Sequence, residues 1–392
     1  MAYTIKHLEL EESIKILYSL NNYAFRPTPP LPDFDEFSEL IRGRKGVDYY
    51  GVFEDGQPQA IAAAIALKQN IRGRIMSMGG VANVATHPAA RRKGFVRALM
   101  HQVYKEFANE GMGVSCLYPF KEAFYQRLGY VTLPQPKTIR FDPKVLSPTL
   151  KMNFEGKVEL VNFEDYREEF RRFLEKLQQN THGMALFSFP QTDAARKSSF
   201  WLALAKQQDE IIGMMRYNLK GQSLDQLLSA PDFLFTNNQG KFLLFNWIAR
   251  HIDQATKVEL NLSPSIPGEI LFTDIRPQYE GVFVAPMARV TDVASLNSIT
   301  CGEGAINIQI IDPNCDWNNR TWNFNSVGEH LEITKSTIPD CRLSIQGLTG
   351  LIYGIYRSEE INLREWGEIG KQSRKILDKM FPPEIPFLHA MY

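Results

Sequence analysis

The 392-residue sequence has little cysteine, no excess of either charge and no long apolar run. Its seven histidines and four cysteines show no metal-ligand spacing and no Cys-x-x-Cys pair, so we expect neither a metal site nor a redox motif. The cysteines are Cys116, Cys301, Cys315 and Cys341. The 44 basic and 44 acidic residues balance, which argues against nucleic acid as a partner.

Targeting and membrane segments are also missing from the sequence. The segment that starts at Met1 lacks the basic and apolar regions of a signal peptide. No run of about 18 apolar residues occurs, so no membrane span is expected. We therefore expect a soluble, cytoplasmic protein, and its length predicts two or three domains at roughly 150 residues each.

The most specific pattern lies in residues 81–100. Apolar residues suit a buried strand that Pro88 ends, and a basic turn with Gly94 leads into apolar positions at helical spacing. A helix N-terminus offers unpaired N–H groups and a positive dipole end, and glycine lets the backbone approach a bulky group. The segment therefore predicts a strand, a pyrophosphate-binding turn and a helix. A basic turn in an unrelated α/β protein fits the turn alone equally well.

A second segment supports the first. Residues 114–118 read as a strand, and residues 119–130 read as a short helix that contains Phe-Tyr-Gln-Arg-Leu-Gly-Tyr. Together the two segments resemble motif A and the end of the GNAT acyl-CoA N-acetyltransferase domain. Helices expected at 11–22 and 35–42 and a hairpin at 49–67 precede them, which is again a GNAT-like order.

Two further domains are expected downstream. Residues 151–286 repeat a strand, a loop, a helix and a strand without Arg-x-x-Gly, and we interpret them as a degenerate GNAT-like domain that does not bind CoA. An unrelated α/β domain is the alternative, and residues 200–207 are expected to be helical. Alternating strand-like runs and helices in residues 287–392 indicate an α+β domain. The expected fold is mixed α/β, with the active GNAT domain in residues 1–150.

The whole chain resembles the Eis (enhanced intracellular survival) acetyltransferases. Besides the GNAT motifs, the resemblance rests on Met-Ala-Arg-Val-Thr-Asp-Val at 287–293 and Leu-Thr-Gly-Leu-Ile-Tyr-Gly at 348–354. It implies tandem GNAT domains, the second degenerate, and a C-terminal domain like sterol carrier protein. It also implies a homo-oligomer, a hexamer, that transfers acetyl from acetyl-CoA to amines of small molecules such as aminoglycosides.

The resemblance further implies which residues form the site. Tyr125 would be the general acid and the terminal carboxylate on Tyr392 the general base, while Phe25 and Arg26 would edge the acceptor pocket. Acetyl-CoA, as the co-substrate, would contact Val84, Thr86, Arg91, Arg92, Gly94, Phe95, Val96 and Phe120. Val96 stands where the GNAT signature usually has Gly or Ala, so its side chain must point away from the phosphates.

Acetyl transfer to an amine requires both a proton acceptor and a proton donor. An amine is mostly protonated near neutral pH and must lose a proton before it attacks a thioester, and a carboxylate can accept that proton. A phenol with a pKa of about 10 stays protonated and can donate to the leaving thiolate. Read without the resemblance, Tyr125 is more simply a core tyrosine and a C-terminus is usually frayed. The apolar residues within 387–392 suggest instead that this tail is docked.

Other functions stay open. The nearest alternative enzyme is a lysine or polyamine N-acetyltransferase, and a non-catalytic protein that binds acyl-CoA or an apolar ligand is a third possibility. A polycationic acceptor favours an acidic pocket. The candidates for that pocket are Asp33, Asp35, Glu36 and Glu122.

Overall fold

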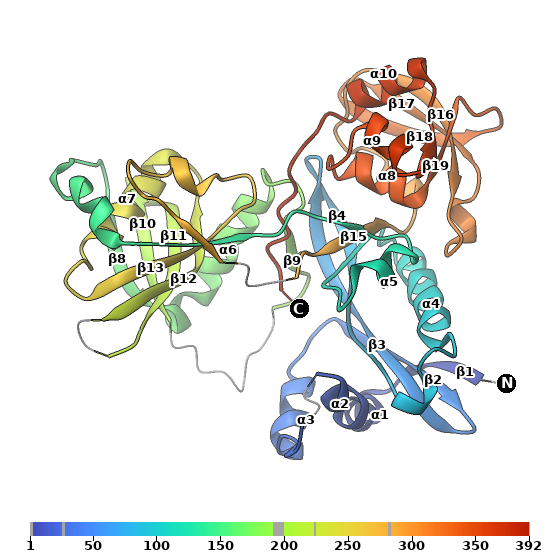
Figure 1. Cartoon of the computed structure of the whole chain (residues 1–392), viewed down its shortest axis with the longest axis horizontal. Coiled ribbons are helices and arrows are strands. Elements are labelled where there is room, and N and C mark those ends of the chain that lie inside the picture. Colours follow the sequence, from blue (N-terminus) through green and yellow to red (C-terminus); the bar gives the residue numbers. More distant parts are fainter. Residues whose placement is uncertain (1–2, 26–27, 191–199, 223–224, 281–283, 392) are drawn as a thin grey trace. The chain divides into compact units, whose positions relative to one another are not determined.

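The computed structural model describes residues 3–25, 28–190, 200–222, 225–280 and 284–391. Its chain divides into two compact units, and Figure 1 labels most of their helices and many of their strands. The first unit comprises Met1–Leu133, His182–Ala195 and Val284–Tyr392, and the second comprises Pro134–Thr181 and Arg196–Phe283. The second unit thus starts at Pro134, whereas the sequence analysis placed a boundary at residue 150.

A mixed sheet is the framework of the first unit. Its strand order is β1-β2-β3-β4-β5-β15-β6, with β9 added to β3. Strands β4 and β5 pair in parallel, and the other pairs described for this sheet are antiparallel. The strands are β1 Tyr3–Leu8, β2 Val47–Glu54, β3 Gln57–Ile71, β4 Arg74–Thr86, β5 Val114–Leu117, β6 Val131–Thr132, β9 Ala185–Phe187 and β15 Met287–Val290.

Helices cover both faces of this sheet because β3 is apolar on both sides. Ala60, Ala62 and Ala64 join the hydrophobic cluster of α4, whereas Ile61 and Ala63 join the cluster of the N-terminal helices. Neighbouring strand residues point to opposite faces, so these two sets separate the helices. The helices are α1 Leu10–Ile16, a π-helical segment Leu17–Asn21, α2 Asn22–Phe25, α3 Phe34–Arg42, α4 Phe95–Asn109 and α5 Glu122–Gln126.

The chain leaves the first sheet after β6 and returns to it at β15. After β6 the chain enters the second unit through β7 (Lys137–Phe141), and β15 later returns to lie between β5 and β6. The sequence analysis expected residues 287–293 to open the C-terminal domain, but their first four residues lie in the first sheet. All four are buried, as an interior strand requires.

The second unit repeats the arrangement of the first. Its sheet order is β14-β7-β13-β12-β11-β10-β8, and β12 and β13 pair in parallel around α7. The elements, with one more helix, are β8 Lys157–Asn162, α6 Arg167–Gln178, β10 Trp201–Gln207, β11 Glu210–Lys220, β12 Gln226–Phe235, α7 Asn238–Ala249, β13 Ala255–Leu262 and β14 Gln278–Glu280.

The expectation of a helix at 200–207 is wrong, because residues 201–207 form β10. Leu202 and Leu204 belong to one hydrophobic cluster of the second unit, and Ala203 and Ala205 belong to the other. The strand is therefore buried on both faces, and a continuous apolar run of this kind does not separate strand from helix by periodicity.

The C-terminal region of the first unit is α+β. Its five-stranded sheet has the order β18-β17-β16-β19-β20. Its elements are β16 Ala305–Ile311, β17 Thr321–Val327, β18 His330–Ser336, β19 Cys341–Ser344, α8 Ile345–Ile352, α9 Ser358–Leu363, β20 Gly367–Glu368 and α10 Lys371–Met380. In the described residues, no helix is long and apolar enough to cross a membrane.

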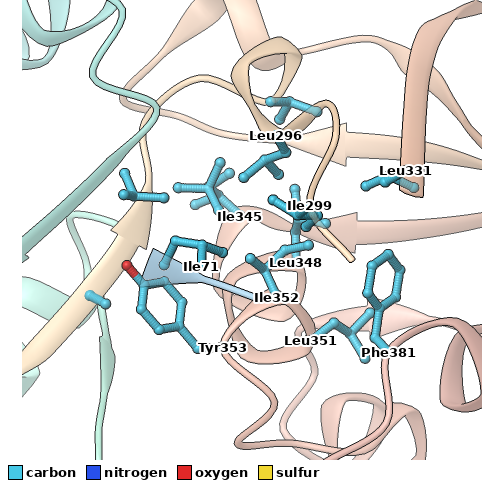
Figure 2. Packing of buried hydrophobic residues seen from close by; sticks show 14 of the residues in the cluster. Ile71, Leu296, Ile299, Leu331, Ile345, Leu348, Leu351, Ile352, Tyr353 and Phe381 are labelled. Carbon is cyan, nitrogen blue, oxygen red and sulfur yellow. The ribbon is translucent and has the colours of Figure 1, made fainter. Parts of the chain in front are cut away.

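One hydrophobic core joins this region to the first sheet. Figure 2 shows Ile71, at the end of β3, among Ile345, Leu348, Ile352 and Tyr353 of the α8 segment, all of them buried. Apolar burial contributes roughly 25 cal/mol per Å² removed from water, so a shared core of this kind couples the two parts energetically. The mixed α/β fold predicted from the sequence is confirmed.

Candidate active site

The two parallel strands β4 and β5 separate where β4 carries a bulge. Pairing between them runs from Met78 to Val81, while β4 continues to Thr86. Asn83 and Val84 together oppose a single residue of β3, and Asn83 has a φ of 51°. Bulges bend a strand and interrupt its ladder. In the described residues, no strand pairs with the β5 side of β4 beyond this point.

The backbone of Thr86 points to this open edge. The N–H of His87 donates to the carbonyl oxygen of Gln59 at 2.8 Å, and the next pair of the ladder is Thr86 with Ala60. Hydrogen-bonded and non-hydrogen-bonded pairs alternate in antiparallel sheets, so the N–H and C=O of Thr86 are directed away from β3. This side can hold an extended amide chain such as pantetheine.

The N-terminus of α4 is open to an anion. Gly94 is its N-cap residue, with a φ of 88°, and no side chain caps the helix. A Cβ built on Gly94 would meet no atom within 4 Å, so the space in front of the helix is free. Uncapped first-turn N–H groups with free space before them make a phosphate site.

Basic side chains surround this helix start. Arg91 and Arg92 are exposed, and within the described ranges neither pairs with a carboxylate. The guanidinium of Arg91 lies 6.0 Å from the ring centroid of Tyr23. Lys93 donates instead to Glu54, with Nζ and Oε2 2.8 Å apart, so its charge is compensated. Arg91 and Arg92 therefore supply the charge available to a pyrophosphate.

Phe95 and Val96 face the core rather than the helix start. The ring of Phe95 is buried and lies edge-on to Tyr3, with ring centroids 5.4 Å apart. Val96 is half-buried and packs against the hydrophobic cluster of α4. Both can contact a phosphate only through the backbone. The side chain of Val96 does not obstruct the site, as the sequence analysis required.

Tyr125 lies in α5 among other aromatic rings. It is 3% exposed, and Phe120, Phe124 and Tyr130 lie around it with centroids within 6.0 Å. Phe120 itself is 72% exposed, a ring left at the surface beside Tyr125. Among the described residues, the Tyr125 hydroxyl makes no hydrogen bond. Burial raises its pKa above the ordinary value, so the phenol keeps its proton.

The C-terminal tail is docked beside this segment. The hydroxyl of Tyr118, which directly follows β5, donates to the carbonyl oxygen of Ala390 at 3.1 Å. Leu388 and Ala390 are buried in the shared core, and the N–H of Phe387 donates to His182 at 2.9 Å. Position 390 is therefore fixed at the end of β5, while Tyr392 itself lies outside the described residues.

The bulge of β4 is held from the side of the N-terminal helices. Asn83 donates to the Oδ1 of Asn21 in the π-helical segment at 3.2 Å and accepts from Arg44 at 3.2 Å. Phe25, at the end of α2, is exposed, and Arg26 lies outside the described residues. Asn21 and Arg44 were not among the predicted site residues. The position of Asn21, a polar residue on the apolar side of the first helix, was the only signal in the sequence.

The acidic candidates for an acceptor pocket differ in their contacts. Asp33 caps α3 by accepting from the N–H groups of Asp35 and Glu36, and Glu122 accepts from the hydroxyl of Thr132 at 2.7 Å. Asp35 and Glu36 are exposed in the first turn of α3. These two carboxylates are therefore the more available pair.

Comparison with known families assigns two parts of the chain. Residues 4–133 match the acetyltransferase (GNAT) domain. The chain carries a GNAT acetyltransferase domain. Residues 293–389 match the sterol carrier protein domain, so the predicted C-terminal domain is confirmed as well. GNAT domains use acetyl-CoA, and this domain makes the protein an N-acetyltransferase.

Solved structures share the fold over the whole chain. A GCN5-related N-acetyltransferase from Anabaena variabilis (16% identity, TM-score 0.86) and a probable N-acyltransferase from Enterococcus faecalis (17%, 0.85) each cover 100% of both chains. Eis1 from Mycobacterium abscessus has 19% identity and a TM-score of 0.80, again with 100% of both chains covered. No curated protein matches the sequence. Identities this low establish the fold alone.

Proposed function

We propose that this GNAT protein transfers the acetyl group of acetyl-CoA to a primary amine of an aminoglycoside-like small molecule by direct attack. The observation that carries the proposal is a C-terminal tail docked on the segment that leads from β5 to the buried phenol of Tyr125. Tyr125 is buried without a hydrogen-bond partner in the described chain. Tyr118, seven residues earlier in the sequence, holds Ala390 through a hydrogen bond. Tyr118 and Tyr125 both follow Leu117, the last residue of β5 that pairs with β4.

The residues at the helix start fit the co-substrate. Arg91 and Arg92 hold the pyrophosphate together with the N–H groups that follow Gly94. Val84 and Thr86 hold the pantetheine along the open edge of β4. Acetyl-CoA supplies the acetyl group as a thioester that an amine can attack.

Two groups of the chain move protons in this proposal. The carboxylate of Tyr392 takes a proton from the substrate ammonium, and the freed amine nitrogen forms the new C–N bond as the C–S bond breaks. The Tyr125 hydroxyl donates its proton to the departing sulfur, and the phenolate takes up the second proton that the nitrogen loses as the amide forms. The carboxyl group of Tyr392 then releases its proton to solvent. A raised pKa keeps the donor protonated before the step and makes its phenolate a short-lived base.

The acceptor class rests on the resemblance to Eis acetyltransferases and on the available carboxylates of Asp35 and Glu36. A lysine or polyamine acceptor is the alternative, and a panel of amines assayed by thiol release separates the classes. Tight CoA binding without turnover on any amine would instead favour a binding protein. The homo-oligomer, a hexamer in the Eis family, stays a prediction that light scattering tests.

The first variant to make is Tyr125→Phe. Loss of a positioned proton donor typically lowers kcat by roughly 10²–10⁴-fold, while CoA binding should stay unchanged because the phenol does not hold the cofactor. Steady-state thiol release and calorimetric titration with CoA measure the two quantities. Tyr3→Phe, at an exposed tyrosine, is the matched control. Full turnover by Tyr125→Phe would remove the phenol from the mechanism.

A glycine added after Tyr392 tests the base. It moves the terminal carboxylate by one residue while Tyr118 still holds Ala390. We expect kcat to fall by roughly 10²-fold or more, the lower range for a displaced proton acceptor. Unchanged activity of the extended chain would place the base elsewhere.

A further inference from the structure

The helix that carries Tyr125 is too short to hold itself in place. Helix α5 has five residues, Glu122–Gln126, and helices shorter than about 12 residues are marginal by themselves. The carbonyl groups at a helix C-terminus have no partner within the helix, and they accept from the turn that follows or from other parts of the chain. At the end of α5 the N–H of Gly129 donates to Gln126 at 3.0 Å, and further donors come from distant residues. Its position must therefore come from contacts with the rest of the protein.

Three consecutive carbonyls after Tyr125 receive side-chain donors from the C-terminal part of the chain. The amide of Gln346 donates to Gln126 at 2.9 Å, and the amide of Asn314 donates to Arg127 at 3.4 Å. The guanidinium of Arg289 donates through Nη1 to Leu128. The three donors come from β15, from the loop after β16, and from α8.

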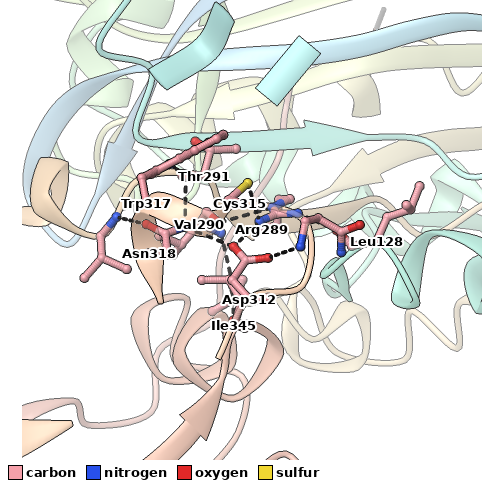
Figure 3. A network of polar contacts seen from close by, with 12 residues as sticks. Leu128, Arg289, Val290, Thr291, Asp312, Cys315, Trp317, Asn318 and Ile345 are labelled. Carbon is pink, nitrogen blue, oxygen red and sulfur yellow. Dashed lines mark hydrogen bonds and ion pairs between the residues drawn. The ribbon is translucent and has the colours of Figure 1, made fainter. Parts of the chain in front are cut away.

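Arg289 is fixed in turn by a buried carboxylate. Its Nη2 lies 2.6 Å from Oδ2 of Asp312, and both side chains are 0% exposed. The guanidinium also stacks over the ring of Tyr104, 4.3 Å from the centroid, and Nη2 lies 3.2 Å from the sulfur of Cys315. Asn318 donates to the same carboxylate oxygen at 3.0 Å. Figure 3 shows this network around Arg289, with Leu128 at its other end.

We propose that Arg289, Asn314 and Gln346 are positioning residues for acetyl transfer: they fix the last turn of α5 so that the Tyr125 hydroxyl stands where the leaving sulfur must be protonated. The inference rests on the proposed role of Tyr125 as general acid. Through Asn314 and Gln346, the sterol-carrier-like region then contributes to catalysis by positioning Tyr125. This contribution is distinct from the proposed role of the Tyr392 carboxylate. Misplacement of a reacting group by about 1 Å can cost a factor of roughly 10² in rate.

Gln346→Ala is the most informative variant, because Gln346 is half-buried and its loss should leave the core intact. We expect kcat to fall about three- to tenfold, the factor that corresponds to one net hydrogen bond, with KM for acetyl-CoA unchanged. Gln346→Met keeps the volume without the donor and should match it, whereas Gln346→Lys keeps an N–H donor and should restore most of the activity. Gln309→Ala, at a glutamine that accepts from Arg342 on the same domain, is the control.

A double-mutant cycle separates positioning from general stabilisation. If Gln346 acts through Tyr125, then Gln346→Ala should change the residual rate of the Tyr125→Phe variant by less than about 1.5-fold, because linked effects are not additive. Equal losses in both backgrounds, or unchanged kcat in Gln346→Ala and Gln346→Met, would overturn the inference. A Tyr125→Phe variant with full turnover would overturn the proposed function itself, which is a distinguishable result.

Discussion

Two of the parallel strand pairs, β4 with β5 and β12 with β13, have the same topology and different helix starts. Each pair is joined by one helix, and each first strand bulges where the pair separates. In β4 the bulge residues are Asn83 and Val84, and in β12 they are Ala230 and Pro231. Proline has no N–H to offer a ligand. The second pair therefore has the same bulge as the first, but Pro231 lacks the backbone N–H that Val84 has at the matching position.

The helix starts differ even more clearly. In α7 the side chain of Asn237 accepts from the N–H of Gly240 at 2.9 Å, so the helix caps itself. A Cβ on Gly240 would come within 2.2 Å of the carbonyl oxygen of Ile212, which shows how closely this helix start packs on β11. At Gly94 the cap is absent and the space is open. A few residues thus separate the open, uncapped helix start at Gly94, where we propose that the pyrophosphate binds, from the capped and closely packed start of α7.

The largest effect is expected from Gly94→Asp. The new carboxylate would face the pyrophosphate at the open helix start, and we expect CoA binding to weaken by about 100-fold or more. Gly94→Asn is the matched control, because asparagine has the same shape without the charge and tolerates a positive φ. Calorimetric titration with CoA measures both. Equal losses in the two variants would assign the effect to shape rather than charge.

A smaller effect is expected from Arg91→Ala and Arg92→Ala. Each loses a charge-assisted hydrogen bond, which corresponds to roughly tenfold weaker CoA binding. The chemical step at saturating acetyl-CoA should change little, because both side chains are assigned to the pyrophosphate and not to the acetyl group. The salt dependence of CoA binding should decrease in both variants. A lower kcat with unchanged affinity would contradict the assignment.

The smallest effect is expected from Asn237→Ala in the second unit. Loss of an N-cap side chain destabilises a helix by about 1 kcal/mol, which thermal unfolding measures. CoA binding and kcat should not change, since the proposed CoA site lies at the start of α4 and not at α7. A changed CoA affinity in this variant would show that the two helix starts are functionally connected. That result would contradict the assignment of CoA binding to the start of α4 alone.

The sequence predicted the elements whose signals are local. The strand, basic turn and helix around Gly94 follow from apolar spacing and turn chemistry within twenty residues, and the structure places them as expected. The tail was expected to dock from its apolar residues, and Leu388 and Ala390 are buried. Tyr125 was singled out by a family motif, and its surroundings suit a proton donor. These features need no knowledge of distant contacts.

Features that depend on long-range pairing were missed. The strand β10 has an unbroken apolar sequence that fits a helix as well, and only burial on both faces decides the matter. The membership of β15 in the first sheet depends on partners more than 150 residues earlier in the chain. Arg289 reads as an exposed basic residue until Asp312 is placed beside it. Pairing of this kind leaves no periodic trace in sequence.

The insertion of β15 between β5 and β6 has a consequence for biosynthesis. When Leu133 has been made, the first sheet still lacks this interior strand, and residues 134–286 must follow before it is available. At about 5–20 residues per second, ribosomes need roughly ten to thirty seconds for that stretch. During this interval the nascent GNAT domain has an unfilled slot bordered by two strand edges. The first sheet can therefore be completed only after β15 has been synthesised, late in translation.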